Sequence, residues 1–465
     1  MTMWHKVSGL GGRAWFFSSR PKACCVRWKE SRRQRGSRAS NGCEPTGSPG
    51  GASGRCAVAP TAPERSSRRE PTVTMPSPGP AVRRRPYASL SMRLPRSTRL
   101  GFQPPAIGEE EIAAVTETLR SGWLTTGPRA SLLEERMAAY LDAEHVLAVA
   151  SGTAALHLAL LAVGVGPGDE VITSPITWPA TANVIEHCGA VPVFCDVRDT
   201  DLNIDPDLVP ALVTERTKAI LPVHLAGQVA DLDPIMALGL PVVEDAAHAA
   251  ESAYRGRKIG SISDASCFSL YATKNIAAGE GGLVATNRDD VAEAIGNMRL
   301  TRRGDGARYD QVTPGFKANL SDVLAAIALV QLDRVEEHTR VRLRQFDLYD
   351  QGLAGLSGIA PLVRDDRDTH ARHLYVVRID EATAGASRDT YQQALADELI
   401  GTSIHFLPVH RLTWFRERYP AQPPLPVAER AGDEVLSLPL SPAHSDDDIL
   451  DAVDALRRVH ERFTA

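Results

Sequence analysis

Residues 242–248 read V-V-E-D-A-A-H and residues 268–275 read F-S-L-Y-A-T-K-N, and the glycine-rich G-E-G-G follows at 279–282. Asp245 ends an apolar strand pattern, and Lys274 follows a second such pattern just before the glycine-rich turn. Parallel α/β sheets bind their ligands at the carboxyl ends of strands, where we expect both residues to lie. The aspartate and the lysine therefore guide the interpretation of the whole chain.

Short apolar runs alternate with stretches long enough for a helix from about residue 100 onward. Gly, Pro or Asp bounds each run, which is typical of strand ends. This alternation predicts β-α-β units, and hence a mostly parallel sheet with helices on both faces. The expected strands are 145–149, 170–173, 191–194, 219–223, 241–243, 266–269 and 282–285.

The C-terminal part has a different pattern. A long helical periodicity from 320 to about 356 is expected to carry the chain out of the first domain. Beyond it we predict a smaller α+β unit, with strands near 374–379 and 402–405, a helix opening after Ser387, and a closing helix over 446–463.

The charge of the chain is split unevenly, although its composition of 43% hydrophobic and 23% charged residues is that of a globular enzyme. Residues 1–85 carry seventeen Lys and Arg against four acids, a net +13, so the remainder of the chain carries −18 to reach the total of −5. This first segment lacks periodic apolar spacing. We predict that 1–92 is a basic low-complexity extension, either disordered or not part of the native enzyme. A nucleic-acid-binding arm is the less favoured alternative, and no apolar core supports a signal peptide.

Three of the seven cysteines lie outside the basic extension, and they indicate the cellular location. Cys188, Cys195 and Cys267 stand in apolar surroundings without metal-ligand spacing. They are expected to be buried packing thiols of a reducing cytoplasm, and we expect no metal site. No run approaches the ~20 apolar residues of a membrane span, so no membrane segment is predicted.

The lysine and the aspartate suit pyridoxal phosphate (PLP). This cofactor needs an amine that forms a Schiff base with its aldehyde, and a carboxylate that keeps its pyridine nitrogen protonated. Lys274 and Asp245 supply these two groups, and the hydroxyl of Ser269 is well placed to help hold a phosphate. We therefore predict a PLP site.

Two further segments support this prediction only in combination. Ser151-Gly152-Thr153-Ala154 opens a helix, where free N–H groups and a hydroxyl can surround a phosphate, although alone it is more often an ordinary N-cap. Trp178 follows a strand end and could stack on a planar ring, although a lone Trp is more often part of the core. The order of these signals along one α/β domain makes the combination specific.

With these residues in place, the chain resembles the DegT/DnrJ/EryC1/StrS family of sugar aminotransferases from about residue 95 to the C-terminus. The resemblance is carried by S-G-W-L-T-T-G-P at 121, S-G-T-A-A-L at 151, T-W-P-A-T-A-N at 177, P-V-H-L-A-G at 222, V-E-D-A-A-H-A at 243 and F-S-L-Y-A-T-K-N-I-A-A-G-E-G-G at 268. Within the family the chain is most similar to the UDP-4-amino-4-deoxy-L-arabinose–oxoglutarate aminotransferase branch, on T-P-G-F-K-A-N-L-S-D at 313 and G-T-S-I-H-F at 401.

The resemblance implies a role for each matching cofactor residue. Lys274 should form the Schiff base, and Asp245 should pair with the pyridine nitrogen. Trp178 should stack on the cofactor ring, and His248 should lie near its phenolic oxygen. The residues expected at the phosphate are Thr153, Ala154, Ser269 and, from the partner subunit, Asn319.

The resemblance also implies the substrate and the assembly. Lys317, His405 and Phe406 fall where the family contacts its sugar nucleotide. Because Asn319 is expected to reach a neighbour's site, we expect a cytoplasmic homodimer with shared active sites, and no nucleic-acid or membrane partner.

The expected fold is that of fold-type I (aspartate aminotransferase-like) PLP enzymes, with a PLP-binding large domain over 93–335 and a small C-terminal α+β domain over 336–465. The expected activity is transfer of an amino group from glutamate or glutamine to a keto-sugar nucleotide, at C4 of the sugar.

Several alternatives stay open at this stage. A 3-keto sugar or a keto-cyclitol would suit the same residues, and so would a non-catalytic PLP-binding regulator. A dehydratase of the family would use pyridoxamine phosphate and carry His in place of the lysine, so Lys274 argues against it. A cysteine desulfurase would need an exposed, mobile cysteine, which the strand positions of Cys267 and its neighbours disfavour.

Overall fold

A computed structural model describes residues 93–300 and 311–465 of the chain. The predicted basic extension, 1–92, lies outside the described residues. Among the helices of the described ranges, none is long and apolar enough to cross a membrane. Cys188, Cys195 and Cys267 are free and buried, as predicted.

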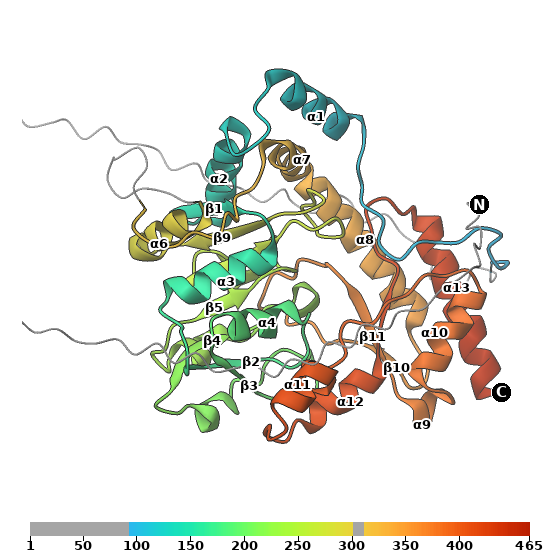
Figure 1. Ribbon diagram of the computed structural model, residues 1–465. Coiled ribbons are helices and arrows are strands. Elements are labelled where there is room, and N and C mark those ends of the chain that lie inside the picture. The colour runs from blue at the N-terminus through green and yellow to red at the C-terminus, as the bar shows by residue number, and fades with distance from the viewer. Residues whose placement is uncertain (1–92, 301–310) are drawn as a thin grey trace, which may run out of the picture. The chain divides into compact units, whose positions relative to one another are not determined.

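A mixed sheet of seven strands forms the centre of the larger part of the structure (Figure 1). Its strands are β1 (His145–Val149), β2 (Glu170–Thr173), β3 (Val191–Phe194), β4 (Thr217–Leu221), β5 (Val243–Asp245), β8 (Ala265–Ser269) and β9 (Gly282–Thr286). One group has the order β1-β9-β8-β5 and the other β3-β2-β4, and two parallel bridges, Ile220 to Val242 and Val223 to Asp245, join β4 to β5. The two antiparallel pairings of this sheet, β1 with β9 and β8 with β9, both involve β9, and the other pairings are parallel, so the sheet is mostly parallel, as the sequence predicts.

Helices cover both faces of this sheet, because alternate residues of each strand point to opposite faces. Val146 and Ala148 of β1 pack with α2 (Pro128–Leu141) and α7 (Asp322–Asp333). Leu147 and Val149 pack with the other face's helices, α3 (Gly152–Ala162), α4 (Ala180–His187) and α6 (Asp289–Arg299). The remaining elements of this part are α1 (Glu109–Ser121), α5 (Leu232–Met236), β6 (Ala253–Tyr254) and β7 (Arg257–Lys258).

The C-terminal part contains a three-stranded antiparallel sheet with the order β10-β11-β12. Its apolar residues pack against α8, α10 and α13, and α13 contacts both other helices (Figure 1). The elements are α8 (Val335–Leu353), β10 (Ile359–Pro361), β11 (Tyr375–Ile379), α9 (Glu381–Ala384), α10 (Arg388–Asp397), α11 (Thr413–Arg418), α12 (Pro426–Glu434), β12 (Val435–Leu438) and α13 (Asp446–Thr464). The predicted domain boundary at 335/336 falls in the first turn of α8, and the two-domain division stays a prediction.

The helical pattern expected over 320–356 is present as two helices, α7 and α8, which are separated where the backbone turns at Arg334, whose N–H is shared between the carbonyls of Val330 and Gln331. One local prediction was wrong. The strand expected over 402–405 is a single bridge between Ser403 and Ser437, since the following residues turn into the wall of a cavity instead of extending the sheet.

Candidate active site

A cavity of about 480 Å³ lies at the carboxyl ends of β2, β4, β5 and β8, where the sequence places its candidate residues. It brings together eight of the predicted residues: Thr153, Trp178, Asp245, His248, Ser269, Lys274, His405 and Phe406. It is also lined by Ser151 and Gly152 of the predicted phosphate-binding segment, and by residues to which the sequence gave no role, among them Gln103, Thr177, Tyr271, Glu280 and His373.

Asp245 is held in one orientation at the end of β5. Thr181 Oγ1 donates to its Oδ2 at 2.6 Å, and the Ala247 N–H donates to its Oδ1 at 3.2 Å. Thr177 hydrogen-bonds the Thr181 hydroxyl at 2.7 Å, so the carboxylate is supported by a second layer. Only 6% of Asp245 is exposed, and the residue can therefore act on a bound group without free access of water.

Lys274 lies in the turn that connects β8 to β9, and it lines the same cavity. Burial lowers the pKa of its amine to about 8, against the raising effect of the Asp245 charge. A sizeable fraction of the amine is therefore neutral near pH 7–8, and a neutral amine is the nucleophile that a carbonyl needs.

His248 is buried in the wall of the cavity and is a neutral ring. Burial lowers its pKa well below the ordinary value, and the charges of Lys274, His373 and His405 lower it further. Its Nδ1 accepts a hydrogen bond from the Ala226 N–H at 3.3 Å. The proton of the neutral ring is therefore on Nε2, which makes that atom a donor.

The N-terminus of α3 forms one end of the cavity. Ser151 caps the helix, since its Oγ accepts from the Ala154 N–H at 3.0 Å. Gly152 lies so close to Ser269 that a Cβ at position 152 would stand 3.0 Å from Ser269 Cβ. Backbone N–H groups at a helix start, with two hydroxyls beside them, suit an anionic phosphate. Ala154 itself does not line the cavity.

The opposite wall comes from the C-terminal part. Phe406 is 8% exposed, and its ring lies 6.2 Å from Trp178 and 6.0 Å from His248. His405 Nδ1 shares a 2.9 Å hydrogen bond with Ser437 Oγ, and burial lowers the pKa of His405 to about 4. Trp178 is 64% exposed, so it is an open wall of the cavity and not a core residue.

Asn319 and Lys317 do not line this cavity. Asn319 Nδ2 donates to Thr126 Oγ1 at 2.5 Å, and its Oδ1 accepts from Lys317 Nζ. Both residues lie beside the N-terminal end of α7. Their predicted contacts with cofactor and substrate remain predictions.

Comparisons with known proteins agree with this geometry. The model of the DegT/DnrJ/EryC1/StrS aminotransferase family matches residues 105–457. The spore coat polysaccharide biosynthesis protein SpsC of Bacillus subtilis (strain 168) is 45% identical over 381 residues, covering 78% of this chain and 98% of SpsC. The chain belongs to the DegT/DnrJ/EryC1/StrS aminotransferase family.

Solved structures extend this comparison to the fold and the cofactor. Spr1654 of Streptococcus pneumoniae, assigned as a sugar aminotransferase, has a TM-score of 0.75 in its PMP form at 35% identity, covering 79% of this chain and 98% of that chain. It is also known in a PLP form. DesI in the presence of its TDP-sugar product has a TM-score of 0.73 at 34% identity, covering 79% and 94%. The protein is thus a PLP-dependent sugar aminotransferase of fold type I, which confirms the predicted fold class, cofactor and enzyme class.

The residues of the aminotransferase fit PLP. A buried carboxylate, an amine of lowered pKa and a helix N-terminus line one cavity, and these match the ring nitrogen, the aldehyde and the phosphate. Gly282 has room for no side chain, because a Cβ there would come to 2.3 Å from the Ser151 carbonyl oxygen. The close approach of these two backbones shapes the end of the cavity at the N-terminus of α3, where we expect the phosphate.

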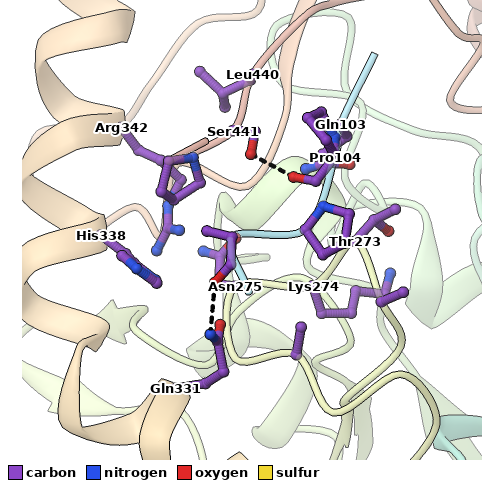
Figure 2. Close-up of a pocket in the computed structure, with 15 residues that line it drawn as sticks. Gln103, Pro104, Thr273, Lys274, Asn275, Gln331, His338, Arg342, Leu440 and Ser441 are labelled. Atoms are coloured by element: carbon purple, nitrogen blue, oxygen red, sulfur yellow. Dashed lines mark hydrogen bonds between the residues drawn. The ribbon is translucent and has the colours of Figure 1, made fainter. Parts of the chain in front are cut away.

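A second, much smaller cavity of about 20 Å³ shares Gln103, Thr273 and Lys274 with the first (Figure 2). Figure 2 shows Arg342 and His338 reaching from α8 toward Asn275, with Lys274 beyond it. The aminotransferase therefore has polar side chains on both sides of the lysine turn. The sequence gave no role to His373, Asn275 or Arg342, because nothing in their local pattern shows which residues they face.

Proposed function

We propose that the enzyme transfers an amino group from glutamate or glutamine to C4 of a nucleotide-linked keto sugar, in the cytoplasm, as a homodimer with shared active sites. The observation that carries this proposal is that one cavity is lined by Asp245, Lys274 and His248 on one wall and by His405 and Phe406 on the opposite wall. A volume of about 480 Å³ is within the range for small-molecule sites. The TDP-sugar product of the related DesI supports a nucleotide sugar as the substrate.

Lys274 is proposed to move the proton. PLP, when bound, supplies a ring that accepts the electron pair released when a C–H bond next to the amine breaks. The amine of Lys274, with a pKa of about 8, is poised to take that proton and return it to a neighbouring carbon. The same side chain can serve both half-reactions, because the amino donor and the sugar use the cavity in turn.

Asp245 and His248 are proposed to hold the ring in its working state. The carboxylate of Asp245, oriented by Thr181, would face the ring nitrogen and favour its protonated form. His248 would donate its Nε2–H to the phenolic oxygen. Both groups are fixed by hydrogen bonds to the protein, so they need no rearrangement when charge develops.

The surroundings of Asn319 support the shared site. Near Asn319, whose amide bonds Thr126, three apolar side chains stand exposed: Trp123 at 55%, Leu124 at 51% and Phe316 at 48%. Exposed aromatic and aliphatic groups of this kind are typical of protein interfaces. A second copy seated here would cover them and bring Asn319 and Lys317 to the neighbouring cavity.

Mixing two inactive variants tests the shared site. Lys274→Ala and Asn319→Ala dimers, each inactive or weak, are exchanged and assayed together. A shared site gives each mixed dimer one intact cavity, so about a quarter of wild-type activity should return in a statistical mixture. Recovery should be absent if each cavity is built from one chain.

A substrate panel tests the reaction. The enzyme is given glutamate or glutamine with UDP- and dTDP-linked 4-keto and 3-keto sugars and a keto-cyclitol, and the position of the new amine is read by NMR. We expect a 4-amino product. Amination of a 3-keto sugar or the cyclitol alone would overturn the C4 assignment, and turnover with none of the nucleotide sugars would overturn the substrate class.

A further inference from the structure

A chain of buried polar side chains runs from α8 to the cofactor cavity. Arg342 and Glu251 form an ion pair whose side chains are only 2% and 5% exposed. Glu251 Oε2 accepts a 2.9 Å hydrogen bond from Asn275 Nδ2, and Asn275 Oδ1 shares a 2.9 Å bond with His373 Nδ1. Asn275 is the residue after Lys274, so this chain meets the lysine turn directly.

The hydrogen bonds of Asn275 determine which ring nitrogen of His373 carries the proton. Asn275 Nδ2 donates to two acceptors, Glu251 Oε2 and the Ala371 carbonyl at 2.9 Å, and its oxygen is therefore the atom that faces His373. An oxygen can only accept, so His373 Nδ1 must carry the proton. Burial lowers the pKa of His373 well below its ordinary value, with the charge of Lys274 adding to the effect, and the ring is neutral.

The face of this locked ring packs on His248. The two ring centroids lie 4.4 Å apart with an interplanar angle of 34°, which is closer than the 6.0 Å between His248 and Phe406. His248 also accepts a hydrogen bond from the Ala226 N–H through Nδ1. This hydrogen bond and the packing against the His373 ring together fix the direction in which the Nε2–H of His248 points. The Ala226 carbonyl in turn accepts from the backbone N–H of His373 at 3.1 Å, so both histidines are hydrogen-bonded to Ala226.

We propose that His373 is a positioning residue for the cofactor: locked by Asn275 and the Glu251–Arg342 pair, it holds the His248 ring in the orientation that donates to the cofactor. The inference rests on the proposed role of His248. It gives a role to the buried Glu251–Arg342 ion pair and the buried Asn275 amide, which contact neither Asp245 nor the N-terminus of α3. Burial of a charge or an amide lowers stability unless the group is well paired.

A double-mutant cycle on cofactor binding tests this role. Apoenzyme variants His373→Ala, His248→Ala and the double variant are titrated with PLP, followed by quenching of tryptophan fluorescence, because Trp178 lines the cavity. If His373 acts through His248, each single variant should bind PLP about 10-fold more weakly, and the double variant should also bind about 10-fold more weakly. His444→Ala is the matched control, since His444 is buried but lines neither cavity, and its affinity should be unchanged.

Two results would overturn the proposal: a double variant weakened about 100-fold, which means independent effects, or a His373→Ala apoenzyme with wild-type affinity. If His373→Ala does not fold, His373→Asn keeps a donor for Asn275 Oδ1 without the ring, and the same non-additive loss is expected of it. PLP binds before any sugar, so this test stands apart from the fate of the keto-sugar proposal.

Discussion

The two walls of the cavity are built differently. The wall on the central sheet carries Asp245, Ser269 and Lys274 at or just after strand ends, and Asp245 has two hydrogen bonds that fix its carboxylate. The other wall carries His405 and Phe406 on a segment joined to β12 by one backbone bridge at Ser403 and by the side-chain hydrogen bond of His405 to Ser437. Strand ends in a seven-stranded sheet hold side chains more firmly than a segment that has one backbone bridge and one side-chain hydrogen bond to its neighbour.

The difference between the walls suggests that they have different roles in the reaction. Under the proposed function, the groups that act on the cofactor lie on the sheet wall, where their positions are closely held, and the groups proposed to contact the sugar lie on the less constrained wall. Variants of the sheet wall should therefore change the chemical step, and variants of the C-terminal wall should change substrate affinity.

Removal of the lysine should have the largest effect. Lys274→Ala lacks both the covalent attachment and the proton-transfer group, so kcat should fall by about 10⁴-fold or more. Borohydride treatment followed by mass spectrometry should no longer find cofactor fixed to the chain. Lys218→Ala, an exposed lysine on β4, is the control and should keep wild-type kcat. A Lys274→Ala enzyme with near wild-type turnover would contradict the assignment of the chemical step to the sheet wall.

Loss of the Asp245 charge should rank second. Asp245→Asn keeps the size of the side chain but removes the charge that favours a protonated ring nitrogen, so kcat should fall on the order of 100-fold. Thr181→Val keeps the charge and loses the hydrogen bonds of the Thr181 hydroxyl to Asp245 and to Thr177, so a loss of about 5-fold is expected. Equal losses in the two variants would mean that orientation, and not charge, is what the sheet wall supplies.

The pH dependence of cofactor capture should follow the lowered pKa of Lys274. Below pH 8 the amine is increasingly protonated, and the neutral fraction falls about 10-fold for each pH unit. The rate at which apoenzyme takes up PLP covalently should therefore rise with pH and level off above about 8. Stopped-flow absorbance between pH 6 and 11 measures the midpoint, and a midpoint near 10.5 would contradict the effect of burial.

The C-terminal wall should give the smallest effect on chemistry. Phe406→Ala removes a ring that lines the cavity beside Trp178, so KM for the sugar nucleotide should rise about 10-fold while kcat changes less than about 2-fold. Trp414→Ala, an exposed aromatic outside the cavity, should leave both constants unchanged. A fall in kcat at constant KM would show that both walls serve the chemical step.

Most of the sheet wall could be predicted from the sequence. Asp245 and Lys274 follow apolar runs at fixed ends of strands, and such ends converge at one edge of a parallel sheet. The strands 145–149, 170–173 and 191–194 have the predicted bounds, because their turn residues are unambiguous. Trp178 follows the end of β2, as predicted. Because it is 64% exposed and lines the cavity, it is not a residue of the hydrophobic core.

The C-terminal wall could be predicted only in part. The pattern at 402–405 resembles a strand, but the geometry there is decided by what Ser403 and His405 meet on β12, which is distant in sequence. His373 stands just before β11, where the local pattern predicts only a strand. Contacts between distant segments leave no periodicity, so Asn275 and His373 become visible only in three dimensions.

The position of β9 has a consequence for the order in which the active site is assembled. Gly282, its first residue, pairs with Val149 at the end of β1 and with Ser269 at the end of β8. In the described chain β9 is also the only strand that lies beside β1. During synthesis from the N-terminus, β1 therefore cannot complete its pairing with β9 until residue 286 has been made. The two halves of the phosphate end are brought together late, by a strand made after both of them.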